Sequence, residues 1–289
     1  MEQIKKRRFG IWAALTLALV LVLFTAWALF RVQQNQRHQD TLDRVLKSGT
    51  ITWGVKSDTK LFGLMDTKEG EPEGFDVDLA RAVTKEIGRE KGKQLKAKIM
   101  PTATASRIQL LKSTNIDATI STMTITPERA KVVDFSQSYF SAGQSLLVAQ
   151  NSGIHSLQDL NSPKKTVLAV VGTTAAQQIK QLAPKAKIVA LQDYASAMQA
   201  LKAGQGQAVS TDNAILFGLA AENPGYHLVG GNYSQASYGI AFSKDQKAMV
   251  KATNNALDRI KADGTYNRLI KKWFQNIPGV DWHQLEVKE

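Results

Sequence analysis

Short apolar runs alternate with longer amphipathic stretches along most of this chain, and this alternation constrains the fold more than any other feature. The first apolar runs lie at 51–55, 98–100 and 117–122, and stretches with helical spacing lie between them at 75–87 and 106–112. Strands separated by helices form parallel sheets, because a parallel pair needs a long crossover connection. We therefore expect an α/β fold.

A second set of alternating runs begins near residue 145 and predicts a second lobe. Its expected strands and helices lie at 145–149, 167–171, 175–182, 187–190, 195–203 and 208–210, and the chain then returns through 238–242. Two α/β lobes fit the two sets, because each set contains enough apolar strands and amphipathic helices to bury a core of its own.

The N-terminal segment predicts attachment to a membrane. Residues 11–30 form a run of 20 residues without charge, which at about 1.5 Å per residue can cross a hydrocarbon core of about 30 Å. A basic cluster at 5–8 precedes the run, so we expect residues 1–10 in the cytoplasm and everything after the run outside. A cleaved signal peptide is the alternative, because Ala-Trp-Ala at 26–28 has the form of a cleavage site. Residues 31–41 read as a polar spacer.

The composition argues against nucleic-acid binding and against attachment to the membrane through a lipid-modified cysteine. The net charge is +12, but the lysines are scattered and form no basic stripe interleaved with aromatic residues, so we expect no nucleic-acid binding. The chain has no cysteine. An exported protein of this sequence can have neither a disulfide framework nor a lipid-modified N-terminal cysteine, so a membrane tether must be the apolar segment itself.

The stretch Thr-Met-Thr-Ile-Thr-Pro-Glu-Arg at 122–129 predicts a strand that ends in hydroxyls and turns directly into a helix. Thr126 can cap this helix, Pro127 suits its first position, and Glu128 favours its positive end. Arg129 then lies in the first turn. A guanidinium beside free backbone N–H groups and threonine hydroxyls can hold one small carboxylate with two hydrogen bonds. A surface arginine paired with a neighbouring carboxylate is the alternative.

Ligands of α/β sheets lie beyond the carboxyl ends of strands, and four loops of this chain are expected at such places. They lie at 57–59, 122–129, 172–174 and 210–213. Asp212, in the last loop, could cap the helix expected to follow it. Together with Arg129, it could also provide the carboxylate that the ammonium group of an amino acid would need.

The sequence carries no recognisable catalytic or metal motif. Its histidines form no pair with metal-ligand spacing, and none lies beside a plausible nucleophile; they are His38, His155, His227 and His283. There is no Gly-x-Ser-x-Gly elbow, no phosphate-binding loop and no His-Glu-x-x-His sequence. We therefore expect a binding protein rather than an enzyme, with no metal and no cofactor.

Several stretches, in this order, closely resemble the extracellular solute-binding proteins of polar amino acid ABC importers, especially the glutamine, glutamate and aspartate receptors. They lie at 53–56, 74–80, 105–107, 115–118, 122–136, 209–212, 237–242, 263–267 and 271–274. None is specific alone, but together they cover about residues 42–277.

The resemblance implies a two-lobed, periplasmic-binding-protein-like clamp (type II) whose chain crosses between the lobes near 139–143 and near 235–238. Residues 42–140 plus 238–289 would form lobe 1, and 141–237 would form lobe 2. Such a receptor captures an amino acid outside the cell and delivers it to separate permease and ATPase subunits. It would be membrane-anchored, or secreted if the N-terminal segment is cleaved. An amino-acid-sensing module and a dehydratase-like enzyme on the same fold are the alternatives.

The resemblance also implies ligand contacts. Arg129 and the Thr124 backbone would hold the α-carboxylate, assisted by Thr173 or Thr174, and Asp212 would hold the α-ammonium group. The full set of expected ligand-binding residues is Asp58, Phe62, Arg107, Thr122, Thr124, Arg129, Thr173, Thr174 and Asp212.

The signals for the ligand's side chain disagree. Asp58 matches a position at which glutamine-binding relatives meet the amide, whereas Arg107 matches an arginine of relatives that take acidic ligands. Val170 stands where some glutamine receptors carry a lysine. Lys56 could supply a cation instead or be an exposed strand lysine, and Phe62 could stack on the ligand or belong to the core. Glutamine and glutamate both remain expected ligands.

Overall fold

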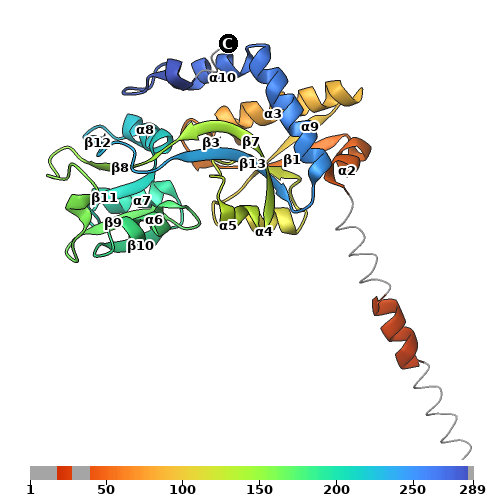
Figure 1. The fold of residues 1–289 in the computed structure, drawn as a ribbon, viewed down its shortest axis with the longest axis horizontal. Helices are drawn as coiled ribbons and strands as arrows, with labels where there is room; N and C mark the ends of the chain where they lie inside the picture. Colours follow the sequence, from red (N-terminus) through yellow and green to blue (C-terminus); the bar gives the residue numbers. More distant parts are fainter. Residues whose placement is uncertain (1–17, 28–39, 286–289) are drawn as a thin grey trace, which may run out of the picture.

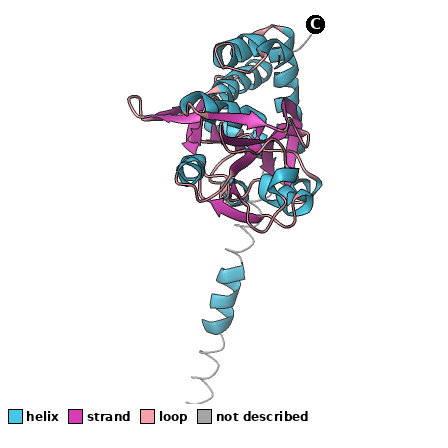
Figure 2. Ribbon diagram, turned by 90° about the vertical axis from the view of Figure 1, so that its left-hand side faces the viewer, coloured by secondary structure: helices cyan, strands magenta, loops and turns pink. Residues whose placement is uncertain are grey.

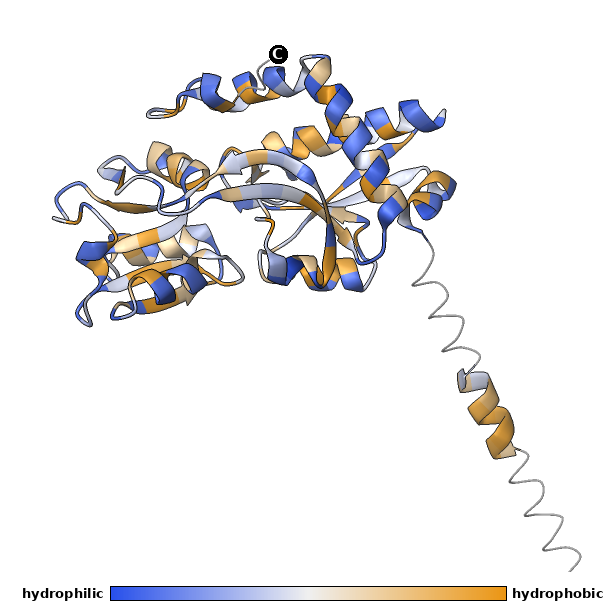
Figure 3. Cartoon of the chain, viewed as in Figure 1, coloured by the Kyte–Doolittle hydropathy of each residue, from blue (hydrophilic) through white to orange (hydrophobic). Residues whose placement is uncertain are grey.

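The structure is a computed structural model that describes residues 18–27 and 40–285 (Figure 1). Residues 18–27 are helical and mostly apolar (Figure 3). The rest of the predicted membrane segment 11–30, and most of the spacer after it, lie outside the described residues. Within the two described ranges, no helix has the length and apolarity of a membrane span.

Lobe 1 is built on a five-stranded mixed sheet with the strand order β5-β1-β6-β13-β7. The strands are β1 (Thr50–Val55), β5 (Lys96–Pro101), β6 (Ala118–Thr119), β7 (Val133–Ala142) and β13 (Ala236–Ser243). β1 runs parallel to β5 and β6, whereas β13 runs antiparallel to β6 and β7. A small antiparallel sheet of β2 (Asp58–Thr59), β3 (Gly63–Asp66) and β4 (Glu71–Glu73) follows β1.

Helices cover both faces of this sheet. They are α2 (Thr41–Ser48), α3 (Phe75–Lys91), α4 (Arg107–Lys112), α5 (Pro127–Ala130), α9 (Lys247–Ala262) and α10 (Thr265–Phe274), followed by the short 3-10 helix η2 (Trp282–Leu285). Figure 1 shows α3 and α9 on one side of the sheet and α4 and α5 on the other. Figure 2 shows the same layering of helices around strands from the side.

Lobe 2 is built on a second five-stranded mixed sheet with the order β10-β9-β11-β8-β12. Its strands are β8 (Gln144–Ala149), β9 (Thr166–Val170), β10 (Lys187–Leu191), β11 (Ala208–Asp212) and β12 (Tyr226–Val229). Its helices are η1 (Gln158–Leu160), α6 (Ala175–Leu182), α7 (Tyr194–Lys202) and α8 (Asn213–Glu222). β9 runs parallel to β10 and β11, and β8 runs antiparallel to β11 and β12.

Local sequence signals explain these elements. The side chain of Asp40 accepts a hydrogen bond from the backbone N–H of Leu42 at 2.8 Å and caps α2. Gly92 ends α3 in the left-handed region, with φ 60°. Residues 167–170 of β9 are fully buried, as expected for a central strand covered on both faces. Val170, which stands where some glutamine receptors carry a lysine, is therefore a core residue.

The expectation of parallel sheets is wrong in part, because both sheets are mixed. β7 leads into β8 of the other lobe through Gly143 alone, without the helix that a parallel connection needs. β13 brings the chain back and pairs with β7 from Ala236 opposite Ala142 to Ser243 opposite Val133. A Cβ atom on Gly143 would lie 2.6 Å from Asn232 and from the carbonyl oxygen of Ser234. The two passages between the lobes therefore run side by side and in close contact.

An aromatic cluster fills the core of lobe 1 beside these passages. The ring of Phe62 meets the rings of Phe75, Phe140, Tyr238 and Phe274 edge-on, with centroid distances of 5.1–6.2 Å. The Phe62 side chain is fully buried. This position corrects the expectation that Phe62 contacts a ligand, because neighbouring rings already cover it.

We predict that replacing Phe62 with Leu lowers the free energy of unfolding by about 1 kcal/mol or more, because the cavity and the lost ring contacts both cost stability. The affinity for an amino acid should change less than about threefold, as expected for a residue that does not touch the ligand. Urea unfolding and calorimetry measure the two quantities. Phe274→Leu, in the same cluster, is the matched control. A loss of affinity at unchanged stability would restore the ligand contact.

Candidate ligand-binding site

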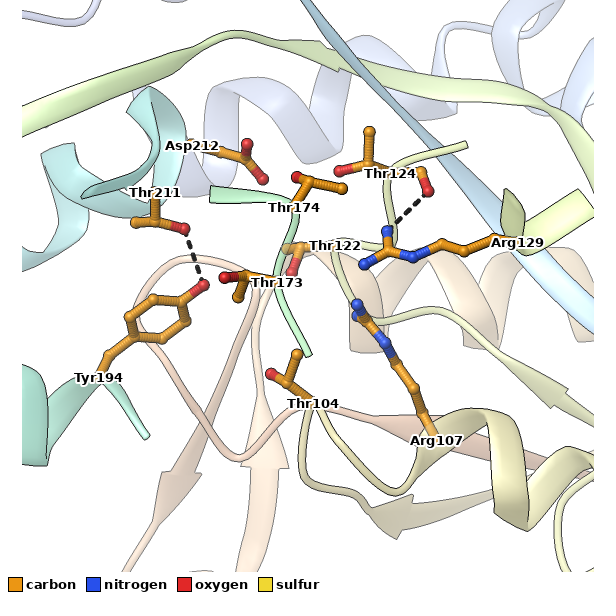
Figure 4. Close-up of a pocket in the computed structure, with 10 residues that line it drawn as sticks. All are labelled: Thr104, Arg107, Thr122, Thr124, Arg129, Thr173, Thr174, Tyr194, Thr211 and Asp212. Carbon is orange, nitrogen blue, oxygen red and sulfur yellow. Dashed lines mark hydrogen bonds between the residues drawn. The ribbon is translucent and has the colours of Figure 1, made fainter. Parts of the chain in front are cut away.

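A small cavity lies between the two lobes. The walls carry hydroxyl groups, two guanidinium groups and one carboxylate. The lining residues are Thr104, Arg107, Thr122, Thr124 and Arg129 of lobe 1 and Thr173, Thr174, Tyr194, Thr211 and Asp212 of lobe 2 (Figure 4). The structure therefore brings together all the predicted ligand-binding residues except Asp58 and Phe62.

The cavity lies where α/β sheets present their ligands, beyond the carboxyl ends of strands. Thr122 and Thr124 follow β6, Thr173 and Thr174 follow β9, and Asp212 ends β11. Thr122 has a positive φ of 48°, an uncommon conformation for this residue type. The buried carboxylate of Asp76 accepts a hydrogen bond from the Thr122 N–H at 2.9 Å and so holds this turn in place.

Arg129 is held in the cavity wall by the capping motif that the sequence indicated. The hydroxyl of Thr126 accepts a hydrogen bond from the Arg129 N–H at 3.2 Å. The Arg129 guanidinium donates to the carbonyl oxygen of Thr124 at 2.8 Å and to that of Gly172 at 2.9 Å. Burial lowers the pKa of Arg129 to about 10, and the charge of Arg107 acts in the same direction.

The contacts of Arg129 do not support the alternative of a surface ion pair with Glu128 or Asp134. Among the described residues no carboxylate forms an ion pair with Arg129, and Asp134 pairs with Lys244 at 2.8 Å. The bond to Gly172 instead joins lobe 1 to the loop after β9 in lobe 2. Gly172 has φ 83°, and a Cβ atom there would lie 3.1 Å from Ala105 Cα, so glycine permits this approach.

Arg107 is buried at the base of the cavity. Its guanidinium donates to the carbonyl oxygen of Ser121 at 2.6 Å. Figure 4 shows it facing the guanidinium of Arg129. No carboxylate among the described residues forms an ion pair with Arg107, and burial lowers its pKa. A buried guanidinium without a counterion is costly, so an oxygen atom of a ligand would stabilise it.

Asp212 provides the one carboxylate of the cavity wall. Its Oδ2 atom accepts a hydrogen bond from the Tyr238 hydroxyl at 2.8 Å, whereas Oδ1 is buried and has no hydrogen-bond partner among the described residues. Burial raises the pKa of Asp212 to about 6, and the Tyr238 hydrogen bond and the charge of Arg129 oppose this shift. The unpaired oxygen is suited to receive a cationic donor.

The alternative role of Asp212 as a helix cap is not what the structure shows. Asp212 stands at the position before α8, but its side chain makes no capping hydrogen bond. The side chain of the next residue, Asn213, accepts the hydrogen bonds of Gly143 and Ala214 instead. The buried carboxylate therefore has no local structural task at the start of the helix.

Asp58 and Lys56 lie behind the cavity wall rather than on it. Asp58 lines a neighbouring groove, which corrects its expected place in the ligand cavity, and its Oδ1 atom pairs with Lys56 Nζ at 2.9 Å. The Lys56 side chain is only 1% exposed, so the expectation of an exposed strand lysine is wrong. Burial lowers the pKa of Lys56, and the charge of Asp58 raises it.

Three lining residues were not predicted. Thr104 follows the strand β5, and Thr211 precedes Asp212, so both share the strand-end placement that marked the other loops. Tyr194 begins α7, and its hydroxyl is 2.9 Å from the Thr211 hydroxyl. Nothing in the sequence around Tyr194 signals this position, which depends on how α7 packs beside β11.

The sequence profile of the bacterial extracellular solute-binding proteins, family 3, matches residues 51–276. This chain belongs to that family. The resemblance seen in the sequence is thereby confirmed, as is the expectation of a binding protein rather than an enzyme. As a family 3 protein, the chain has the expected two-lobed α/β architecture.

Several relatives of this family 3 protein are named for the amino acid that they bind or were solved with. The ABC transporter glutamine-binding protein GlnH of Bacillus subtilis is 46% identical over 84% of this chain and 88% of its own length. An ancestral arginine-binding protein solved with glutamine is 38% identical, covers 78% of this chain and 98% of its own, and has a TM-score of 0.72. The same values hold for an ancestral arginine-binding protein solved with arginine.

We predict that Asp212→Asn separates ligand binding from stability. The folded parent binds more protons at Asp212 than the unfolded chain between about pH 4 and pH 6, because the pKa is raised in the fold. This group therefore makes the ligand-free parent less stable as the pH rises through that window. The uncharged variant should lack this part of the decline and unfold at a higher temperature than the parent at pH 7.

Thermal unfolding of both proteins from pH 4 to pH 7, without ligand, measures the effect. Affinity for an amino acid should fall at least about tenfold in the variant, because the ammonium group loses its countercharge. A variant that is less stable than the parent at pH 7 by about 1 kcal/mol would instead indicate a capping role.

Proposed function

We propose that this protein is the substrate-binding subunit of an ABC importer and that its ligand is glutamine. The observation that carries the proposal is the unpaired Oδ1 atom of Asp212 in the same small cavity as the guanidinium of Arg129. A carboxylate and a guanidinium together match the two charges of a free amino acid. The ammonium group would donate to Asp212, and the α-carboxylate would accept from Arg129 and the threonine hydroxyls.

The side-chain end of the cavity favours an amide over a carboxylate. The ammonium group of Lys56 is already paired with Asp58, which leaves Arg107 as the cation available for one acyl oxygen. The hydroxyls of Thr104 and Tyr194 offer acceptors for the N–H groups of an amide. The GlnH relative, which is named as a glutamine-binding protein, supports the same choice. We expect glutamate to bind more weakly, because the Lys56 charge is already paired with Asp58 and the Arg107 guanidinium is the one cation left at this end for a second carboxylate.

The test is calorimetry of the full-length protein, in mild detergent, against all common amino acids. We expect glutamine to bind in the micromolar range or tighter, which corresponds to about 8 kcal/mol or more. Arg129→Lys keeps the charge but loses the two-pronged geometry, so affinity should fall at least about tenfold. Binding of no amino acid, or conversion of bound glutamine seen by mass spectrometry, would contradict the proposal.

We also propose that residues 11–30 anchor the protein to the membrane and that the permease and ATPase subunits are separate chains. The charge-free run after a basic cluster supports the anchor. Lobe 1, formed by residues 42–140 plus 238–289, and lobe 2, formed by 141–237, would move toward each other. They would hinge about the two adjacent passages and so close over the ligand. N-terminal sequencing of the protein from its host membrane tests the anchor, and a mature chain that begins at residue 29 would refute it.

A further inference from the structure

We infer that Lys56 determines ligand specificity: its side chain fills the place that the cationic end of a longer amino acid would take, and so excludes arginine and lysine from the cavity. The inference rests on the proposed amino-acid site. It adds a role for a residue that does not line the cavity, and it concerns which ligands are rejected.

The Lys56 ammonium group has the surroundings of a bound cation. Nζ lies 2.9 Å from Asp58 Oδ1, donates a hydrogen bond to the Thr104 hydroxyl, and lies 5.0 Å from the centre of the Tyr194 ring. A carboxylate, a hydroxyl and an aromatic face are the groups that bind ammonium and guanidinium ions. Here the cation belongs to the protein itself.

This cation site borders the ligand cavity directly. Thr104 and Tyr194 contact Lys56 and also line the cavity. Figure 4 shows Thr104 on the side of the cavity away from Thr124 and Asp212. An amino acid whose charged ends lie at Asp212 and Arg129 would therefore extend its side chain toward the wall behind which the Lys56 ammonium lies.

A second hollow is lined by Asp58, the ion-pair partner of Lys56. Asp58 and Asp193 line this groove, together with apolar side chains that include Leu64 and Met198. The charge of Asp193 also acts on Lys56. Removing the lysine side chain would leave two carboxylates and a tyrosine ring beside the cavity without a cation. A guanidinium or ammonium group on a ligand of sufficient length could take that place.

Glutamine is unaffected by this arrangement because its side chain is neutral and shorter. A cationic side chain meets two obstacles in the parent: the volume of the lysine stem and the repulsion of its charge. Arg107 is a second cation near this wall and acts on Lys56. It remains in every variant considered below, so differences between variants report on Lys56.

The test is the ligand range of Lys56→Ala, measured by calorimetry on the full-length protein with glutamine, arginine and lysine. We expect the variant to bind arginine at least tenfold more tightly than the parent does, and to keep glutamine binding within about tenfold. Adding Asp58→Asn to the variant should remove most of the gained arginine affinity, because one carboxylate of the cation site is lost. Lys244→Ala is the matched control. It breaks the ion pair between Lys244 and Asp134, whose atoms lie 2.8 Å apart and which does not line the cavity, so it should leave the ligand range unchanged.

Lys56→Met is the second variant, because it keeps the buried stem and removes only the charge. It should bind arginine at least threefold more tightly than the parent, a smaller gain than in the alanine variant. If Lys56→Ala does not fold, Lys56→Met tests the inference instead. Variants that fold and bind glutamine but gain no arginine or lysine binding would overturn the inference and assign Lys56 a purely structural role. Failure of the parent to bind glutamine would instead contradict the proposed function, and the gain of arginine binding could still be scored.

Discussion

The buried carboxylate of Asp212 is the group on which the arrangement of the site depends. It lies at the end of a lobe 2 strand, but its hydrogen-bond partner, the Tyr238 hydroxyl, belongs to the strand β13 by which the chain returns to lobe 1. The backbone of Tyr238 also forms a bridge with Thr124. One residue of the returning strand therefore fixes both the carboxylate that we propose for the ammonium group and the loop that we propose for the α-carboxylate. The ring of Tyr238 packs in the aromatic cluster, which makes this attachment rigid.

The charges of the cavity explain why a binding protein would close on its ligand. Among the described residues, one oxygen of Asp212 has no hydrogen-bond partner and Arg107 forms no ion pair with a carboxylate. Both conditions disfavour the dry, closed state. The proposed zwitterionic ligand would supply the missing donor and acceptors, so closure and binding would stabilise each other. The contact between Arg129 and Gly172 shows that the lobes already approach closely around the same groups.

Local sequence signals predicted the two α/β lobes and most of the cavity wall, because capping motifs and strand ends are defined by neighbouring residues. The antiparallel pairing of β7 with β13 joins segments about one hundred residues apart, and no local pattern reveals it. The sequence was least informative for the end of β1 and the loop after it, where Lys56, Asp58 and Phe62 lie, because none of the three lines the cavity. Lysine is rarely buried unless it is paired, and the buried Lys56 ammonium has two such neighbours: the carboxylate of Asp58 and the ring of Tyr194, which lobe 2 provides. Phe62 was ambiguous for the same reason, since its neighbours come from four distant elements.

The most direct test of this account is the number of protons released when glutamine binds at pH 6, measured by calorimetry in buffers of different ionisation enthalpy. Asp212 is partly protonated at this pH in the ligand-free protein, since its pKa is about 6, and the ligand's ammonium group requires the ionised form. We expect a net release of protons by the parent at pH 6, little release at pH 8, and loss of the release in Asp212→Asn. Glutamine binding at pH 6 without proton release, or with the same release in the asparagine variant, would contradict the claim that the ligand completes the buried carboxylate.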